Sequence, residues 1–171
     1  MRVIISLTLN HFKVNKLFLI AAVFVLAVTQ NSFALDIAKQ IQTPQLLSLY
    51  YNIKNALVTD DANAASLIAQ EFIKALNSTD SKAISESNIA ALLKDANSIV
   101  ETKDIKHQRE HFASLSTDMA VLAKSVKLTD QPVYQAYCPM KKSYWLSSEK
   151  AIKNPYFGSA MLTCGKITET L

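Results

Sequence analysis

The sequence has 171 residues, a length that suits one ordinary domain rather than several. Its formal net charge of +4 comes largely from Arg2, Lys13 and Lys16, and residues 35–171 hold 15 Lys and Arg against 14 Asp and Glu. This near-neutral balance argues against nucleic-acid binding. With only two glycines, the chain also has no Gly-rich loop that could cradle a nucleotide phosphate.

Residues 1–34 have the pattern of a secretory signal peptide. The three basic residues form a positive n-region before an unbroken apolar run of 12 residues from Leu17 to Val28, and Ser32-Phe33-Ala34 is a cleavage site of the small-x-small type. The run is short for a membrane span, which favours cleavage, although an uncleaved signal-anchor stays open as the alternative. The sequence therefore predicts an exported, periplasmic protein with no membrane segment after cleavage, in a compartment that oxidises thiols.

Residues 35–171 are predicted to form a single domain whose first part, about 44–128, is helical. Apolar residues recur there at steps of three and four, in a stretch with one Pro and no Gly. The first helix is predicted to start at Thr43-Pro44 and the second to end near Asn77. A polar turn follows at 77–81, the third helix runs to about Thr102, and the fourth starts near Asp104.

Four amphipathic helices joined by short turns predict an all-α fold, an antiparallel up-down four-helix bundle. Residues 129–171 differ in composition, because they hold both glycines, three of the four prolines and the only Trp. We expect this tail to be an irregular C-terminal segment packed on the bundle. A tight turn at 154–158 should give Gly158 a positive φ and lead the chain back toward Cys138.

The tail carries two short sulfur pairs, Cys138 with Met140 and Met161 with Cys164, which include the only two cysteines of the chain. Thiolates and thioethers are soft ligands that select Cu(I) over hard cations, so the pairs would form a four-sulfur site if they meet. A disulfide is the alternative. It would close a loop of about 25 residues and stabilise the fold by roughly 3 kcal/mol in the chain-entropy model. The methionines would then fill gaps in the core.

The fourth helix opens with His107 and His111, four residues apart and therefore on one helical face. This spacing suits metal capture, and His111 is the better candidate because it flanks the apolar seam at Phe112. Gln108 follows His107, so the general base of a zinc protease is absent. The alternative is an exposed helical turn. A Cys–His nucleophile is conceivable, but an oxidising compartment works against a free catalytic thiol, and we expect no enzyme.

These segments together resemble the DUF3347 family of exported bacterial proteins over residues 44–171. The resemblance rests on residues 107–112 with Leu115-Ser116, on 137–140, on 144–147, and on 152–158 running into 161–165. Family members occur alone after a signal peptide, and also fused to periplasmic adaptor subunits of copper and silver efflux systems. This chain departs from the family in the connection after Met140, which is shorter and lacks glycine.

The resemblance implies a metal-handling role, with Cys138, Met140, Met161, Cys164, His111 and His107 as the candidate ligands. The leading hypothesis is a copper-binding protein that sequesters Cu(I) or passes it to a heavy-metal efflux partner. The second is an interaction module, in which a Cys138–Cys164 disulfide braces a bundle that docks a periplasmic protein. A Cys-dependent oxidoreductase is a weaker third, because the cysteines are 26 residues apart.

Overall fold

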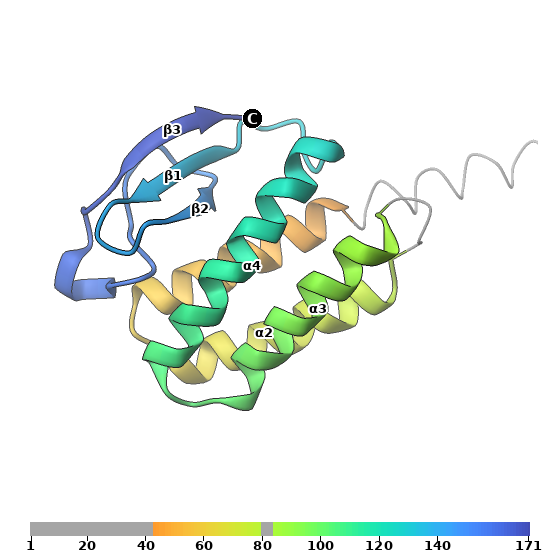
Figure 1. Ribbon diagram of the computed structural model, residues 1–171, viewed down its shortest axis with the longest axis horizontal. Coiled ribbons are helices and arrows are strands. Elements are labelled where there is room, and N and C mark those ends of the chain that lie inside the picture. The colour runs from red at the N-terminus through yellow and green to blue at the C-terminus, as the bar shows by residue number, and fades with distance from the viewer. Residues whose placement is uncertain (1–42, 80–83) are drawn as a thin grey trace, which may run out of the picture. The chain divides into compact units, whose positions relative to one another are not determined.

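The computed structural model describes residues 43–79 and 84–171, so the predicted signal segment 1–34 lies outside the described residues. Residues 43–58 are helical, and three helices and a small sheet follow them (Figure 1). The three helices are α2 (Ala62–Asn77), α3 (Glu86–Glu101) and α4 (Ile105–Ser125). None of the helices in the described ranges has the length and apolarity that a membrane crossing requires.

Each of the three labelled helices begins after a polar residue whose side chain caps it. Asp61 accepts a hydrogen bond from the Ala64 backbone N–H at 2.8 Å, and Asp104 accepts one from Lys106 N–H at 2.8 Å. Ser85 caps α3 in the same way. These bonds satisfy N–H groups that the first turn of a helix leaves free. The predicted end of α2 at Asn77 and the predicted start of α4 after Asp104 are confirmed.

The helices bury one apolar stripe each, as the spacing predicted. Helix α2 packs against α3, and α3 packs against α4, which runs beside it in the opposite direction (Figure 1). Phe112, Leu115 and Met119 lie on the buried face of α4 and are fully shielded from solvent. The helical part of the prediction therefore holds in the described residues.

The prediction of an all-α fold with an irregular tail is wrong, because the tail forms a three-stranded antiparallel sheet. Its strands are β1 (Tyr134–Cys138), β2 (Ser143–Ser147) and β3 (Lys166–Thr170), in the order β2-β1-β3. The first two strands are rich in aromatic residues, which favour a pleated, half-buried surface. A short turn at 139–142 joins them, with Lys142 at a φ of 56°.

Strand β2 joins the sheet to the bundle through α4 and helix 43–58. The Tyr50 hydroxyl accepts a hydrogen bond from the Leu146 backbone N–H at 3.0 Å and lies 2.7 Å from the Ser116 hydroxyl of α4. All three partners are buried, so these polar groups satisfy one another without water. Residues 148–165 then connect β2 to β3 and include a short 3-10 helix, η1 (Gly158–Met161).

Candidate thiol site

The two cysteines meet in the fold. Cys138 ends strand β1 and is fully buried, whereas Cys164 precedes β3 and is half-buried. In the antiparallel pairing of β1 with β3, Tyr137 lies opposite Lys166, so the chain just before β3 runs past Cys138. Both residues are free thiols. Partial burial raises the pKa of the Cys164 thiol, and the charge of Cys138 and a hydrogen bond with it raise that pKa further.

Asn154, a residue of the tight turn, binds both cysteine segments. Its side-chain Nδ2 donates to the Cys138 Sγ at 3.2 Å and to the Cys164 carbonyl at 2.6 Å. Its Oδ1 accepts from the Tyr156 backbone N–H at 2.8 Å, and its own backbone N–H donates to the Leu162 carbonyl at 2.8 Å. The residue is fully buried. Sequence reasoning treated Asn154 only as part of a turn and missed this role.

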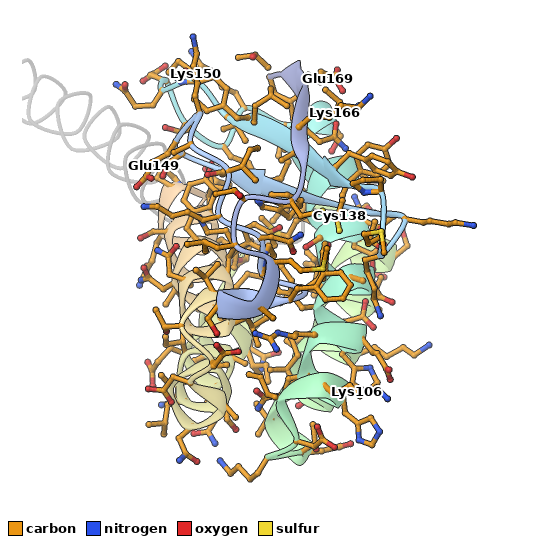
Figure 2. The ribbon with its side chains drawn as sticks, turned by 90° about the vertical axis from the view of Figure 1, so that its left-hand side faces the viewer. Lys106, Cys138, Glu149, Lys150, Lys166 and Glu169 are labelled. Atoms are coloured by element: carbon orange, nitrogen blue, oxygen red, sulfur yellow. The ribbon has the colours of Figure 1, made fainter. Side chains whose placement is uncertain are left out.

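The methionines lie within three residues of the thiols along the chain, and both are at least partly exposed. Met140 is in the β1–β2 turn and is 65% exposed, while the next residue, Lys141, donates its backbone N–H to the Cys138 Sγ at 3.4 Å. Met161 ends η1, is half-buried, and accepts a backbone hydrogen bond from Cys164 at 3.1 Å. Figure 2 labels Cys138 and shows further sulfur atoms close to it in that view.

The predicted histidine ligands face other partners. His107 is exposed, with its Nδ1 3.8 Å from the Asp104 Oδ2. The pKa of Asp95 in α3 is raised chiefly by burial and by the Asp118 carboxylate, and His111 of α4 acts on it in the opposite direction. Within residues 43–79 and 84–171, no three His, Cys, Asp or Glu side chains are grouped to hold a metal ion. The described residues therefore do not bring His111 together with both thiols as the sequence predicted.

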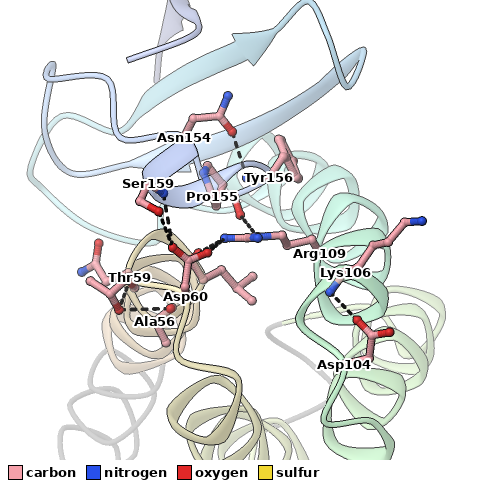
Figure 3. A network of polar contacts seen from close by, with 12 residues as sticks. Ala56, Thr59, Asp60, Asp104, Lys106, Arg109, Asn154, Pro155, Tyr156 and Ser159 are labelled. Atoms are coloured by element: carbon pink, nitrogen blue, oxygen red, sulfur yellow. Dashed lines mark hydrogen bonds and ion pairs between the residues drawn. The ribbon is translucent and has the colours of Figure 1, made fainter. Parts of the chain in front are cut away.

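Arg109, which no sequence pattern marks, joins the tail to the helices through hydrogen bonds (Figure 3). Arg109 of α4 donates to the Pro155 carbonyl at 2.8 Å, and to the Leu57 carbonyl and the Asp60 carboxylate at 2.6 Å each. The other Asp60 oxygen accepts from the Ser159 hydroxyl at 2.8 Å. Hydrogen bonds from Arg109 and Ser159 lower the pKa of Asp60. This network fixes the start of η1, which leads the chain toward Cys164.

A buried lysine lies elsewhere in the fold. Lys54 of helix 43–58 is 2% exposed, and burial lowers its pKa from 10.5 to about 8. Glu149 opposes this shift and Lys153 adds to it, and these two residues form an ion pair of 2.7 Å. The pattern of apolar residues did not mark Lys54, because lysines are usually exposed.

A model of the family described as "Protein of unknown function (DUF3347)" matches residues 46–131, half of the chain. The match covers helix 43–58 from residue 46 onward, all of α2, α3 and α4, and residues 107–116, on which part of the resemblance rests. The expected extent of 44–171 is longer than the match, which ends before the sheet and both sulfur pairs. No curated protein and no solved structure matches the chain.

Proposed function

Because the chain belongs to the DUF3347 family, a family of unknown function, we propose its function from the site: it binds Cu(I) through Cys138 and Cys164. One observation carries the proposal. The two thiols, 26 residues apart in the sequence, interact in the fold and are not joined by a disulfide. The contact supplies what the sequence could not, a reason to treat the two sulfur pairs as one site.

The chemistry of two adjacent thiols favours a soft, monovalent ion. Cu(I) accepts as few as two or three sulfur ligands, whereas structural zinc needs four protein ligands. Two thiolates from Cys138 and Cys164 would carry the binding, and the thioethers of Met140 and Met161 are within a few residues of them. Because thiolates must form, binding releases protons and weakens as the pH falls.

The exposure of the site suits transfer as well as storage. Cys164 is half-buried and Met140 is 65% exposed, so a partner could reach the ion from this side, while the Cys138 sulfur is shielded. We propose that the protein acts after export, where it sequesters Cu(I) or passes it to a heavy-metal efflux adaptor or another periplasmic protein.

A Cu(I) competition titration of the reduced protein, without oxygen, tests the proposal. Wild type should bind one equivalent, and Cys138→Ser or Cys164→Ser should abolish tight binding because a single thiolate remains. Met161→Leu should weaken binding less, since it removes only a thioether. The matched control is Met119→Leu, a methionine buried in α4 and outside the tail that carries the two sulfur pairs. Tight binding by both cysteine variants would contradict the proposal.

The same thiol contact also favours the second candidate, an interaction module with a Cys138–Cys164 disulfide. Sulfur atoms placed this close oxidise readily in an oxidising compartment. Counting free thiols in protein purified without reductant separates the candidates. Zero free thiols together with no Cu(I) binding after reduction would favour the disulfide, and two free thiols would favour the metal site.

A further inference from the structure

We infer that Asn154 is a positioning residue of the thiol site, whose side-chain N–H donates to the Cys138 sulfur and sets the affinity for Cu(I). The inference rests on the proposed function and adds a residue that neither the sequence pattern nor the family match identifies. Asn154 lies 16 residues from Cys138 and 10 from Cys164 along the chain, yet its amide nitrogen reaches both.

The orientation of the amide is fixed by its neighbours. Oδ1 faces a donor, the Tyr156 backbone N–H, and Nδ2 faces an acceptor, the Cys164 carbonyl. A flipped amide would place oxygen against a carbonyl and nitrogen against an N–H, and would lose both bonds. An N–H group therefore points at the Cys138 sulfur.

This contact matters most when the sulfur is charged. Cys138 is fully buried, and a buried thiolate requires hydrogen bonds or a cation to offset lost hydration. Asn154 supplies one N–H and Lys141 supplies a second from the backbone, at 3.2 and 3.4 Å. Donors of this kind orient and tune ligand sulfurs, and loss of such a partner typically reduces metal affinity about 10- to 100-fold.

Asn154 also holds the second sulfur segment in place. The same Nδ2 binds the Cys164 carbonyl, and the Asn154 backbone N–H binds the Leu162 carbonyl. The distance between the two thiols thus depends on Asn154, which contacts both the Cys138 segment and the Cys164 segment. A metal site whose ligands are not held in place before binding has a lower affinity, because ordering the ligands on binding costs conformational entropy.

The substitution Asn154→Asp tests the inference, because it keeps the shape and the Oδ1 acceptor but replaces the donor with an oxygen. We expect Cu(I) affinity at pH 7 to fall about 10- to 100-fold relative to wild type. The deficit should shrink as the pH is lowered and the new carboxyl group protonates, since a protonated carboxyl can donate again. Asn97→Asp, an exposed change on α3, is the matched control and should behave like wild type at every pH.

Three results would overturn the inference while leaving Cu(I) binding intact. Asn154→Asp could bind like wild type, or could lose the same factor at every pH, which would indicate a structural role only. If the variant does not fold, the side-chain amide signals of 15N-labelled wild type decide. Addition of Cu(I) should shift the Asn154 signal more than the Asn97 signal, and an unmoved Asn154 signal is the third contrary result.

A wild type that binds no Cu(I) is a different failure. It would remove the proposed function, and the role of Asn154 in metal affinity would fall with it. The contact itself would still be visible, because Cys138→Ser should shift the Asn154 amide signal in the metal-free protein.

Discussion

Gly158 is the residue on which the junction between the tail and the helices depends most directly. Its φ of 53° lies in the left-handed region, and a Cβ built there would stand 2.3 Å from an Arg109 guanidinium nitrogen and 2.6 Å from an Asp60 oxygen. The ion pair between Arg109 and Asp60 thus occupies the space that any other side chain would need. Glycine satisfies the backbone geometry and the close approach together.

We expect Gly158→Ala to lower the free energy of unfolding by roughly 2–5 kcal/mol, from backbone strain together with displacement of the ion pair. Urea unfolding followed by circular dichroism measures the change. The exposed substitution Ala160→Ser, two residues along η1, serves as the control and should have little effect. An alanine variant as stable as wild type would show that the network can shift at little cost.

The sequence predicted the positive φ of Gly158 but not the close approach of Arg109 and Asp60 that also requires glycine there. Asn-Pro and Gly within five residues predict a turn with a positive φ, and that is confirmed. The partners Arg109 and Asp60 lie 49 residues apart, and much of what Arg109 binds is backbone carbonyl, which leaves no pattern in a sequence. Asn154 escaped notice for the same reason, since its contacts depend on the path of the tail.

Among the strands, β2 makes the most extensive contact with the helices, through α4. It is an edge strand of the sheet, so half of its backbone groups point away from β1. The Leu146 N–H finds the Tyr50 hydroxyl instead of a neighbouring strand. One side chain of helix 43–58 thereby satisfies a strand and also contacts Ser116 of α4.

Tyr50→Phe should destabilise the protein by about 1–3 kcal/mol, because it leaves the buried Leu146 N–H without an acceptor while the ring stays in place. Chemical denaturation monitored through Trp145, the neighbour of Leu146 in β2, reports the loss. Tyr134→Phe is the matched control, since Tyr134 starts β1 and is half-buried. Equal stability of the two variants would mean that water or another group replaces the lost acceptor.

The helices could be predicted from the sequence more readily than the strands. The helices bury a single stripe, so the spacing of apolar residues revealed α2, α3 and α4. The strands have five residues each, and three consecutive residues of β2 are buried, which removes the alternation that usually identifies a strand. The tail was predicted to be irregular because its glycines and prolines indicate turns.

At the scale of the whole fold, Lys54 is a buried charge within the described part of the chain. It lies at 2% exposure on helix 43–58, near the Glu149–Lys153 pair that follows β2. Burial lowers its pKa to about 8, so folding is opposed while the amine is charged. Between about pH 8 and 10.5 the unfolded chain binds more protons than the folded one, and stability contributed at this residue rises with pH.

Lys54→Met should therefore raise the free energy of unfolding at pH 7 by roughly 1–3 kcal/mol, with a gain that shrinks as the pH rises from 8 to 9.5. The measurement is the difference in unfolding free energy between variant and wild type across that range. Higher pH is avoided because of Tyr50 and Tyr156, whose pKa values are raised by burial in the folded protein. Near pH 10 these tyrosines would ionise in the unfolded chain first, which would lower the free energy of unfolding independently of Lys54. Lys106→Met, exposed on α4, should give no pH-dependent difference.

The strand order β2-β1-β3 also has a consequence for folding during translation. The central strand is translated before either neighbour, and the hairpin partner β2 follows within a few residues. The other edge of β1 waits until residues 166–170 have emerged from the ribosome. A nascent chain stalled before β3 emerges would expose the unpaired edge of β1, and Cys138 would lack its neighbour Cys164. Because an unpaired strand edge promotes aggregation, this is the form of the chain that we expect to need a chaperone.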